Sequence, residues 1–168
     1  MKPHNNGDIQ NEAQLLLAIE HIHLACHTLC RQSLQSYLAV AGNIGIFSHS
    51  DEEYTALITL QQTLTDSTKS VYGKYYKLHS PIIIKTVDDV PSATYTYLYV
   101  RKPDPNKPHV GDLDFYLEPT AYAELKQYVL GGTVLGARTL PNRPELDLIE
   151  LYDPKIDALG YIGDKQWK

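Results

Sequence analysis

The sequence lacks long apolar segments and an excess of positive charge, and each absence excludes a class of function. No apolar run is long enough to cross a bilayer, so we expect no membrane-spanning helix. The polar N-terminus, MKPHNNGDIQ, has no signal-peptide core, which favours a cytoplasmic protein. The net charge of −5, without a basic patch, argues against nucleic-acid binding.

Cysteine is scarce, and familiar catalytic motifs are missing. The two cysteines, Cys26 and Cys30, lie one turn apart on a predicted helix, where disulfide geometry is rarely met, so we expect free thiols. The segment GNIG at 42–45 lacks the residues of a phosphate-binding loop, and no GxSxG elbow is present. The motifs therefore assign neither a reaction nor a catalytic residue.

Phenylalanine and tryptophan are also rare, at 2 and 1 residues, whereas tyrosine is abundant, at 13. A tyrosine ring packs on apolar neighbours while its hydroxyl group stays hydrogen-bonded, so tyrosine suits half-buried surfaces. The excess of tyrosine is typical of a β-sheet with a solvated face. The alternative interpretation is a tyrosine-lined ligand cavity.

The clearest pattern lies between residues 94 and 131, where two alternating segments precede a helix. Because side chains alternate across a strand with period two, a strand over 94–101 presents on one face Tyr95, Tyr97, Tyr99 and Arg101. A strand over 110–118 presents an apolar face, and on its other face Asp112, Asp114, Tyr116 and Glu118. A helix over 119–130 follows, with Pro119 in its first turn.

A long helix is predicted over residues 9–41. Its wide apolar arc includes a stripe at three-and-four spacing, formed by Leu15, Ile19, Ile22, Cys26, Leu29, Ser33, Tyr37 and Val40. Such a wide arc indicates a buried helix. We expect residues 1–42 to form a helical extension packed on a single domain of residues 43–163.

The order of elements in that domain repeats. The first unit comprises a strand over 44–48, a helix over 51–65 with a Ser50–Glu53 capping box, and three strands within 72–101. The second comprises a strand over 110–117, a helix over 119–130 and three strands within 133–162. At a constant offset, three residues match between the units: Phe47, Tyr54 and Leu57 with Phe115, Tyr122 and Leu125. We therefore predict an α+β fold in which two βαβββ units form a cupped mixed sheet.

This arrangement resembles the vicinal oxygen chelate superfamily of glyoxalases, bleomycin-resistance proteins and extradiol dioxygenases, and LIELYDPKIDALGYI is similar to the final hairpin of that family. The resemblance implies a cup that holds a divalent metal through histidine and glutamate. Here Asp112 stands at the expected histidine position, and Ile44 stands at its equivalent in the first unit. The glutamate position falls near Gly160 or Tyr161. The expected ligands are mostly absent, so no cofactor is predicted.

One cluster nevertheless carries the residue types of a rearranged metal centre. Carboxylates with one imidazole suit a divalent ion, and His109, Asp112 and Glu150 provide such a set. The alternative is that these side chains are solvated or ion-paired, for instance Asp114 with Arg101.

A second cluster lies in the N-terminal helix. His23, Cys26, His27 and Cys30 fall within one arc of about 100° and are zinc-ligand types. Four ligands from one straight helix cannot surround one ion, so core packing is the favoured interpretation. The alternative is that two of them join a ligand from another segment.

Three functions remain open. The first is a small-molecule-binding protein or metal-independent enzyme whose pocket takes a cationic or aromatic ligand and is lined by Tyr95, Tyr97, Tyr99, Arg101, Asp112, Asp114, Tyr116, Glu150 and Tyr152. The second is a non-catalytic interaction protein, whose N-terminal helix plugs the cup or forms a homodimer interface. The third is a metal-dependent lyase or dioxygenase. Acidic and aromatic side chains together favour the first.

Overall fold

The computed structural model describes residues 9–35, 37, 39–69, 74–140 and 146–164. The elements follow in the order α1 (Glu12–Leu34), β1 (Val40–Phe47), α2 (Asp51–Leu64), β2 (Thr65–Lys69), β3 (Tyr76–Ile84), β4 (Ala93–Arg101), β5 (Gly111–Tyr116), α3 (Pro119–Leu130), β6 (Ala137–Thr139), β7 (Ile149–Leu151) and β8 (Ala158–Gly163). Among these residues, no helix combines the length and the apolar character needed to span a bilayer.

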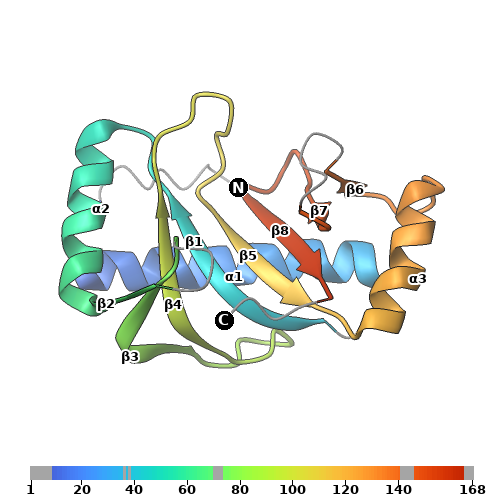
Figure 1. The fold of residues 1–168 in the computed structure, drawn as a ribbon, viewed down its shortest axis with the longest axis horizontal. Helices are drawn as coiled ribbons and strands as arrows, with labels where there is room; N and C mark the ends of the chain where they lie inside the picture. Colours follow the sequence, from blue (N-terminus) through green and yellow to red (C-terminus); the bar gives the residue numbers. More distant parts are fainter. Residues whose placement is uncertain (1–8, 36, 38, 70–73, 141–145, 165–168) are drawn as a thin grey trace.

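The strands of the described residues form one mixed sheet in the order β2-β3-β4-β1-β5-β8-β7-β6. Within each unit the first and last strands pair in parallel, β1 with β4 and β5 with β8, and the other pairs are antiparallel. The two units meet at the centre of the sheet, where β1 and β5 run antiparallel. The predicted α+β fold, with two βαβββ units in one open, cupped sheet, is confirmed (Figure 1).

The N-terminal helix α1 crosses one face of this sheet, behind the strands in Figure 1, and α2 and α3 stand at opposite ends. Its predicted apolar stripe is buried from Leu15 to Ser33 and shares a core with strand residues that include Ile44, Leu98 and Phe115. The last two residues predicted for the stripe lie beyond the helix, where Tyr37 is partly buried and Val40 is exposed. We call this side of the sheet the α1 face. The opposite side, which carries Asp112 and Asp114, is the polar face. Because α1 covers the α1 face, it does not plug the polar face, and its buried stripe is not free to form a homodimer interface.

The boundary between α1 and β1 differs from the predicted one. The helix ends at Leu34 rather than near residue 41, because Gln35 leaves the helical conformation with a φ of 49°. The strand begins at Val40, earlier than predicted, because this segment pairs with β5 through Val40 and Tyr116. Long-range pairing therefore overrides the helical pattern in the sequence at this junction.

Of the three strands predicted within 72–101, the first two form the single strand β3, although residues 72 and 73 lie outside the described residues. Its pairing with β4 shifts register between Lys77 and Ile82, around Pro81. Proline cannot donate to a strand ladder, which is why it is confined to edges and irregularities such as this one.

The residues that match between the two units are equivalent in the helices but not in the strands. Both helical pairs occupy corresponding positions, Tyr54 with Tyr122 and Leu57 with Leu125. Phe47 lies under the guanidinium group of Arg101, on the polar face, whereas Phe115 packs edge-on against His27 of α1. The predicted equivalence of Phe47 and Phe115 is therefore wrong, because a one-residue difference in strand register reverses the face.

Candidate functional site

The strand register gathers polar side chains of the second unit into a row on the polar face. Asp114 on β5 pairs with Tyr161 on β8. Tyr161 pairs with Glu150 on β7, which in turn pairs with Arg138 on β6. Because directly paired residues point to the same side of a sheet, the four side chains lie next to one another.

A second row crosses the join between the two units. Asp112 pairs with Gly45 on β1, and Gly45 pairs with Tyr99 on β4. The side chain of Asp112 lies over Gly45, so closely that a Cβ atom at Gly45 would collide with Oδ1. Asp112 is only 7% exposed, and its Oδ1 has no hydrogen-bond partner. A buried carboxylate oxygen without a donor costs free energy, so Asp112 is the focus of the site.

Two tyrosine rings and a lysine lie beside these carboxylates. The hydroxyl group of Tyr75 donates a 3.0 Å hydrogen bond to Oδ2 of Asp114. The rings of Tyr75 and Tyr99 are 5.5 Å apart between centroids. The ammonium group of Lys74 stands over both, at 5.2 Å from the Tyr75 centroid and 4.9 Å from the Tyr99 centroid. The two rings thus already hold one cation beside the carboxylates.

The two aspartates titrate far from the ordinary range of carboxyl groups. Burial raises the pKa of Asp112 to about 6. Burial, together with the neighbouring charge of Asp112, raises the pKa of Asp114 to about 7. The positive charge of Lys74 opposes both rises. A further cation placed here would favour the ionised forms of both carboxyl groups.

Glu150, in contrast, is fully paired. Its Oε1 accepts hydrogen bonds from Nε and Nη2 of Arg138, at 2.7 and 2.5 Å, and its Oε2 accepts from the hydroxyl group of Tyr161 at 3.0 Å. The guanidinium of Arg138 also stands over the ring of Tyr152, 4.4 Å from the centroid. Glu150 is 3% exposed, and both of its oxygens have donors. This cluster is therefore a completed structural network.

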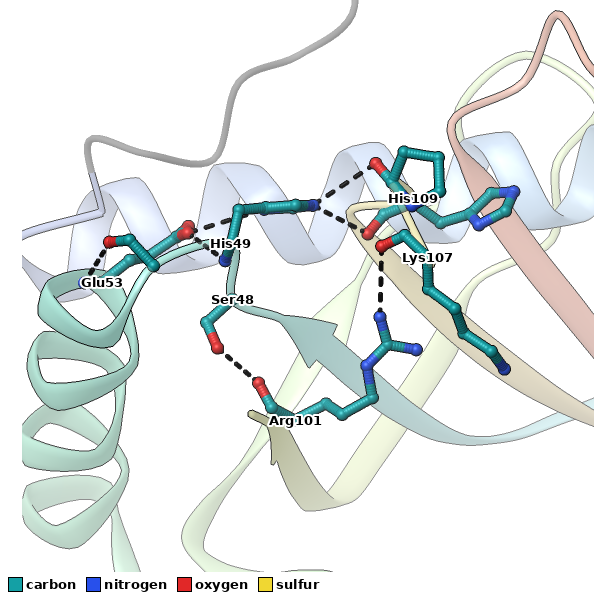
Figure 2. A network of polar contacts seen from close by, with 8 residues as sticks. Ser48, His49, Glu53, Arg101, Lys107 and His109 are labelled. Atoms are coloured by element: carbon teal, nitrogen blue, oxygen red, sulfur yellow. Dashed lines mark hydrogen bonds and ion pairs between the residues drawn. The ribbon is translucent and has the colours of Figure 1, made fainter. Parts of the chain in front are cut away.

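The connection from β4 to β5 is held in place by His49, just before α2, as Figure 2 shows. The Nε2 atom of His49 is 3.3 Å from the carbonyl oxygen of Pro108 and 3.1 Å from that of His109, so it must carry the proton and donate. The backbone N–H of His49 donates to the buried Glu53, whose own N–H is capped by Ser50. The predicted capping box therefore also fixes the loop that follows Arg101.

Five of the predicted pocket residues lie on the polar face as expected: Tyr99, Arg101, Asp112, Asp114 and Glu150. Tyr116 packs its ring over Gly42, and Tyr152 lies under Arg138. Tyr97 pairs with Lys77 and is half-buried. The suggested pair of Asp114 with Arg101 does not form, because Asp114 accepts from Tyr75 instead.

The prediction that Tyr95 shares this face is wrong. Tyr95 is inaccessible to solvent in the core beneath α1, where its hydroxyl group lies 2.6 Å from Nδ1 of His23. The other nitrogen of His23 lies 3.2 Å from the carbonyl oxygen of Pro91, so Nε2 donates and Nδ1 accepts from Tyr95. The irregular register between β3 and β4 breaks the alternation between Tyr95 and Tyr99.

The histidine and cysteine cluster of α1 belongs to the same core. His23 and His27 are buried with their rings 4.4 Å apart, and desolvation lowers the pKa of both. Cys26 donates to the carbonyl oxygen of Leu159, and burial raises the pKa of both free thiols, Cys26 and Cys30. Core packing is therefore the role that the structure gives these residues.

Within the described part of the chain, no three histidine, cysteine, aspartate or glutamate side chains are grouped as a metal site requires. His109, Asp112 and Glu150 do not form such a group, and the oxygens of Glu150 are taken by Arg138 and Tyr161. These residues do not fit the divalent metal that the family resemblance implies. Across β1, the residue opposite Asp112 is Gly45, whereas Ile44 points into the core.

The sequence interpretation missed four residues of the site: Gly45, Lys74, Tyr75 and Tyr161. Alternation within 158–162 places Tyr161 on the face opposite the buried Ile162, so the signal for Tyr161 was present. Gly45 carried no signal beyond its small size. Lys74 and Tyr75 precede β3 in a segment of mixed pattern, and only the pairing of β3 with β4 brings them to Tyr99.

A groove of about 560 Å³ opens next to Lys74 and Tyr99. It runs between α2 and the β2–β4 edge of the sheet and is lined mainly by Tyr54, Ile58, Gln61, Asp66, Lys74, Tyr76 and Tyr99. Lys74 and Tyr99 belong both to this groove and to the surroundings of the buried carboxylates. The groove therefore lies next to the surroundings of the buried carboxylates, although neither carboxylate lines it.

No family model matches the chain, and no curated protein matches it. A solved structure described as "Structural Genomics, Protein EC4020" is similar, with a TM-score of 0.57 and 12% sequence identity, over 97% of this chain and 93% of that chain. At this level of identity the likeness shows the fold alone.

Proposed function

We propose that the protein binds a small organic cation on the polar face of its sheet, between the rings of Tyr75 and Tyr99 and the carboxylate of Asp112. The observation that carries the proposal is Asp112 itself, a carboxylate that is buried, lacks a donor at Oδ1 and lies beside a cation–π site. A cationic ligand supplies the missing donor or charge, and aromatic rings add attraction to it.

The position of Lys74 supports a cation site. Its ammonium group occupies the position over the two rings, although the side chain is exposed and forms no ion pair among the described residues. An exposed lysine held without an ion pair is easily displaced, because its flexible side chain regains rotamer freedom on release. We infer that the ligand's cation replaces the Lys74 ammonium and enters from the adjoining groove.

The arrangement of the two units supports a kinship with the vicinal oxygen chelate proteins, in a form that has lost the metal centre. In this proposal Asp112 has become a ligand-binding carboxylate, and Gly45 leaves the room that its side chain occupies. The proposal is one of binding, and it assigns no catalytic residue.

The test is a calorimetric titration of the full chain with tetramethylammonium chloride at pH 8. We expect saturable binding by the wild type, weakened about tenfold or more by Asp112→Asn, since a buried contact to a charged group is lost. Lys74→Ala should bind more tightly than the wild type, because the internal competitor is removed. Asp88→Asn is the matched control: it removes a carboxylate from the exposed turn between β3 and β4, where φ is 51° and asparagine is well accommodated.

Two results would overturn the proposal. One is the absence of saturable binding by both the wild type and Lys74→Ala. The other is equal affinity of the wild type and Asp112→Asn, which would show that the buried carboxylate takes no part in binding. Thermal melts of each variant establish that the titrated protein is folded.

A further inference from the structure

The polar face also holds a cation that no carboxylate neutralises, the guanidinium group of Arg101. This group stacks on Phe47, with Cζ 3.3 Å from the ring centroid. Its Nη2 donates a long hydrogen bond of 3.4 Å to the carbonyl oxygen of Lys107, and its Nε is buried without a partner (Figure 2). Arg101 forms no ion pair within the described residues. A desolvated N–H group of a fixed guanidinium calls for an acceptor from outside the chain.

Positive charge accumulates around Arg101. The side chain of Lys107 extends past the guanidinium in Figure 2, and the Nδ1 atom of the neighbouring His109 is buried without a partner. Burial lowers the pKa of His109, as do the charges of Lys107 and Arg101, whereas the charge of Glu150 opposes this shift. Burial lowers the pKa of Arg101, and the charges of Asp112 and Asp104 oppose this shift, although neither forms an ion pair with Arg101 among the described residues. Arg101 thus keeps an unpartnered Nε and no direct ion pair among the described residues, which is typical of a site for an anionic group.

The anionic and cationic sites lie on one face at a fixed separation. Asp112 is two strands away from β4, through Gly45 to Tyr99, and Arg101 is two residues beyond Tyr99 on the same side of β4. With strand spacings of about 4.8 Å and a rise of about 3.3 Å per residue, the Cα atoms of Asp112 and Arg101 are about 12 Å apart. The two side chains shorten this gap, which leaves room for a ligand whose opposite charges are separated by a few methylene groups.

We propose that the ligand is a small zwitterion, with its cationic group at Asp112, Tyr75 and Tyr99 and its carboxylate at Arg101. This inference rests on the proposed function, since it places the cationic end in the same site. It adds the chemical class of the other end. The planar guanidinium of Arg101, immobilised on Phe47, favours a carboxylate because the two groups are both planar and form parallel hydrogen bonds.

The experiment compares two probes that differ only at the anionic end: 4-(trimethylammonio)butanoate and its methyl ester, each titrated calorimetrically into the full chain. In the wild type we expect the zwitterion to bind about tenfold more tightly than the ester, or better, because only the zwitterion gains the charge-assisted contact with Arg101. In Arg101→Gln the ratio should fall to about twofold or less. Arg31→Gln, which removes the exposed arginine of α1 that pairs with Asp89, is the matched control and should keep the wild-type ratio.

A second variant keeps the test decisive if Arg101→Gln does not fold. Lys107→Gln changes a half-buried surface side chain and should lower the ratio by about threefold, with a wild-type thermal melt. Equal affinities of the two probes for the wild type would overturn the zwitterion proposal and leave cation binding intact. Failure of both probes and of tetramethylammonium to bind would instead overturn the proposed function. A preference for the zwitterion that survives both Arg101→Gln and Lys107→Gln would refute the assignment of the carboxylate to Arg101.

Discussion

Replacing Asp112 by asparagine should stabilise the protein at alkaline pH, which is unusual for a substitution at a buried polar residue. In the folded protein, burial raises the pKa of Asp112 to about 6, compared with about 3.9 for an ordinary aspartate. The folded state therefore binds this proton more tightly than the unfolded state does. Its contribution to stability is fully present below pH 4 and is lost as the pH rises through about 6.

The size of this change in stability follows from the difference between the folded and unfolded pKa values of Asp112. A rise in the pKa from about 3.9 to about 6 lowers the free energy of unfolding at pH 8 by about 3 kcal/mol relative to strong acid. About 2 kcal/mol of this decrease falls between pH 4 and pH 8. The neighbouring charge of Asp112 also raises the pKa of Asp114, so Asp112→Asn removes part of a second contribution. Asparagine keeps the shape of the side chain without its charge.

Urea unfolding followed by circular dichroism at pH 4, 6 and 8 measures this effect. The free energy of unfolding of the wild type should decline by about 2 kcal/mol more than that of Asp112→Asn over this range, and the variant should be the more stable protein at pH 8. Asp88→Asn, which removes an exposed carboxylate, should follow the wild-type curve. Parallel curves for the wild type and Asp112→Asn would refute the reasoning, since they would show that Asp112 ionises in the folded protein as an ordinary carboxyl group does.

Three further outcomes are expected. Gly45→Ala should lower the free energy of unfolding by about 1–3 kcal/mol in urea titrations and weaken tetramethylammonium binding, because the added Cβ collides with Asp112. Tyr95→Phe should cost about 1–3 kcal/mol, since it leaves Nδ1 of His23 without a donor in the core, yet it should leave tetramethylammonium affinity in calorimetry unchanged. His49→Ala should speed amide hydrogen exchange within residues 102–110, because the two carbonyl groups that hold this connection lose their donor; unchanged exchange there would contradict the role given to His49.

The sequence was sufficient to predict most of the elements in order, because each helix and most strands carry a local signal. It missed β2, which lies at Thr65–Lys69, before the range 72–101 in which three strands were predicted. The capping residue Ser50 and the early Pro119 mark α2 and α3, and period-two alternation marks β4 and β5. Those signals depend only on neighbouring residues, so they can be recognised in the sequence without the tertiary structure. The start of β1 could not be predicted in this way, because its pairing with β5 involves residues distant in the sequence.

The composition of the site was predictable only in part, for a related reason. Asp112 and Asp114 were found because alternation within a regular strand fixes their face. Tyr95 was misassigned because the irregularity opposite Pro81 interrupts the alternation of β4, and nothing within β4 itself reports it. Lys74 enters the site through the approach of two strands, which a pattern within one segment cannot reveal.

The path of α1 limits how this chain can be divided. The helix contacts β1 and β3 of the first unit and β5, β7 and β8 of the second. It therefore packs across the join between the two units, where β1 pairs with β5. Cutting the chain between residues 102 and 110 would leave α1 with the first unit, so the second unit would expose the surface of β5, β7 and β8 that α1 covers. The second unit therefore relies on a helix that the N-terminal part of the chain supplies, and the two units share one core.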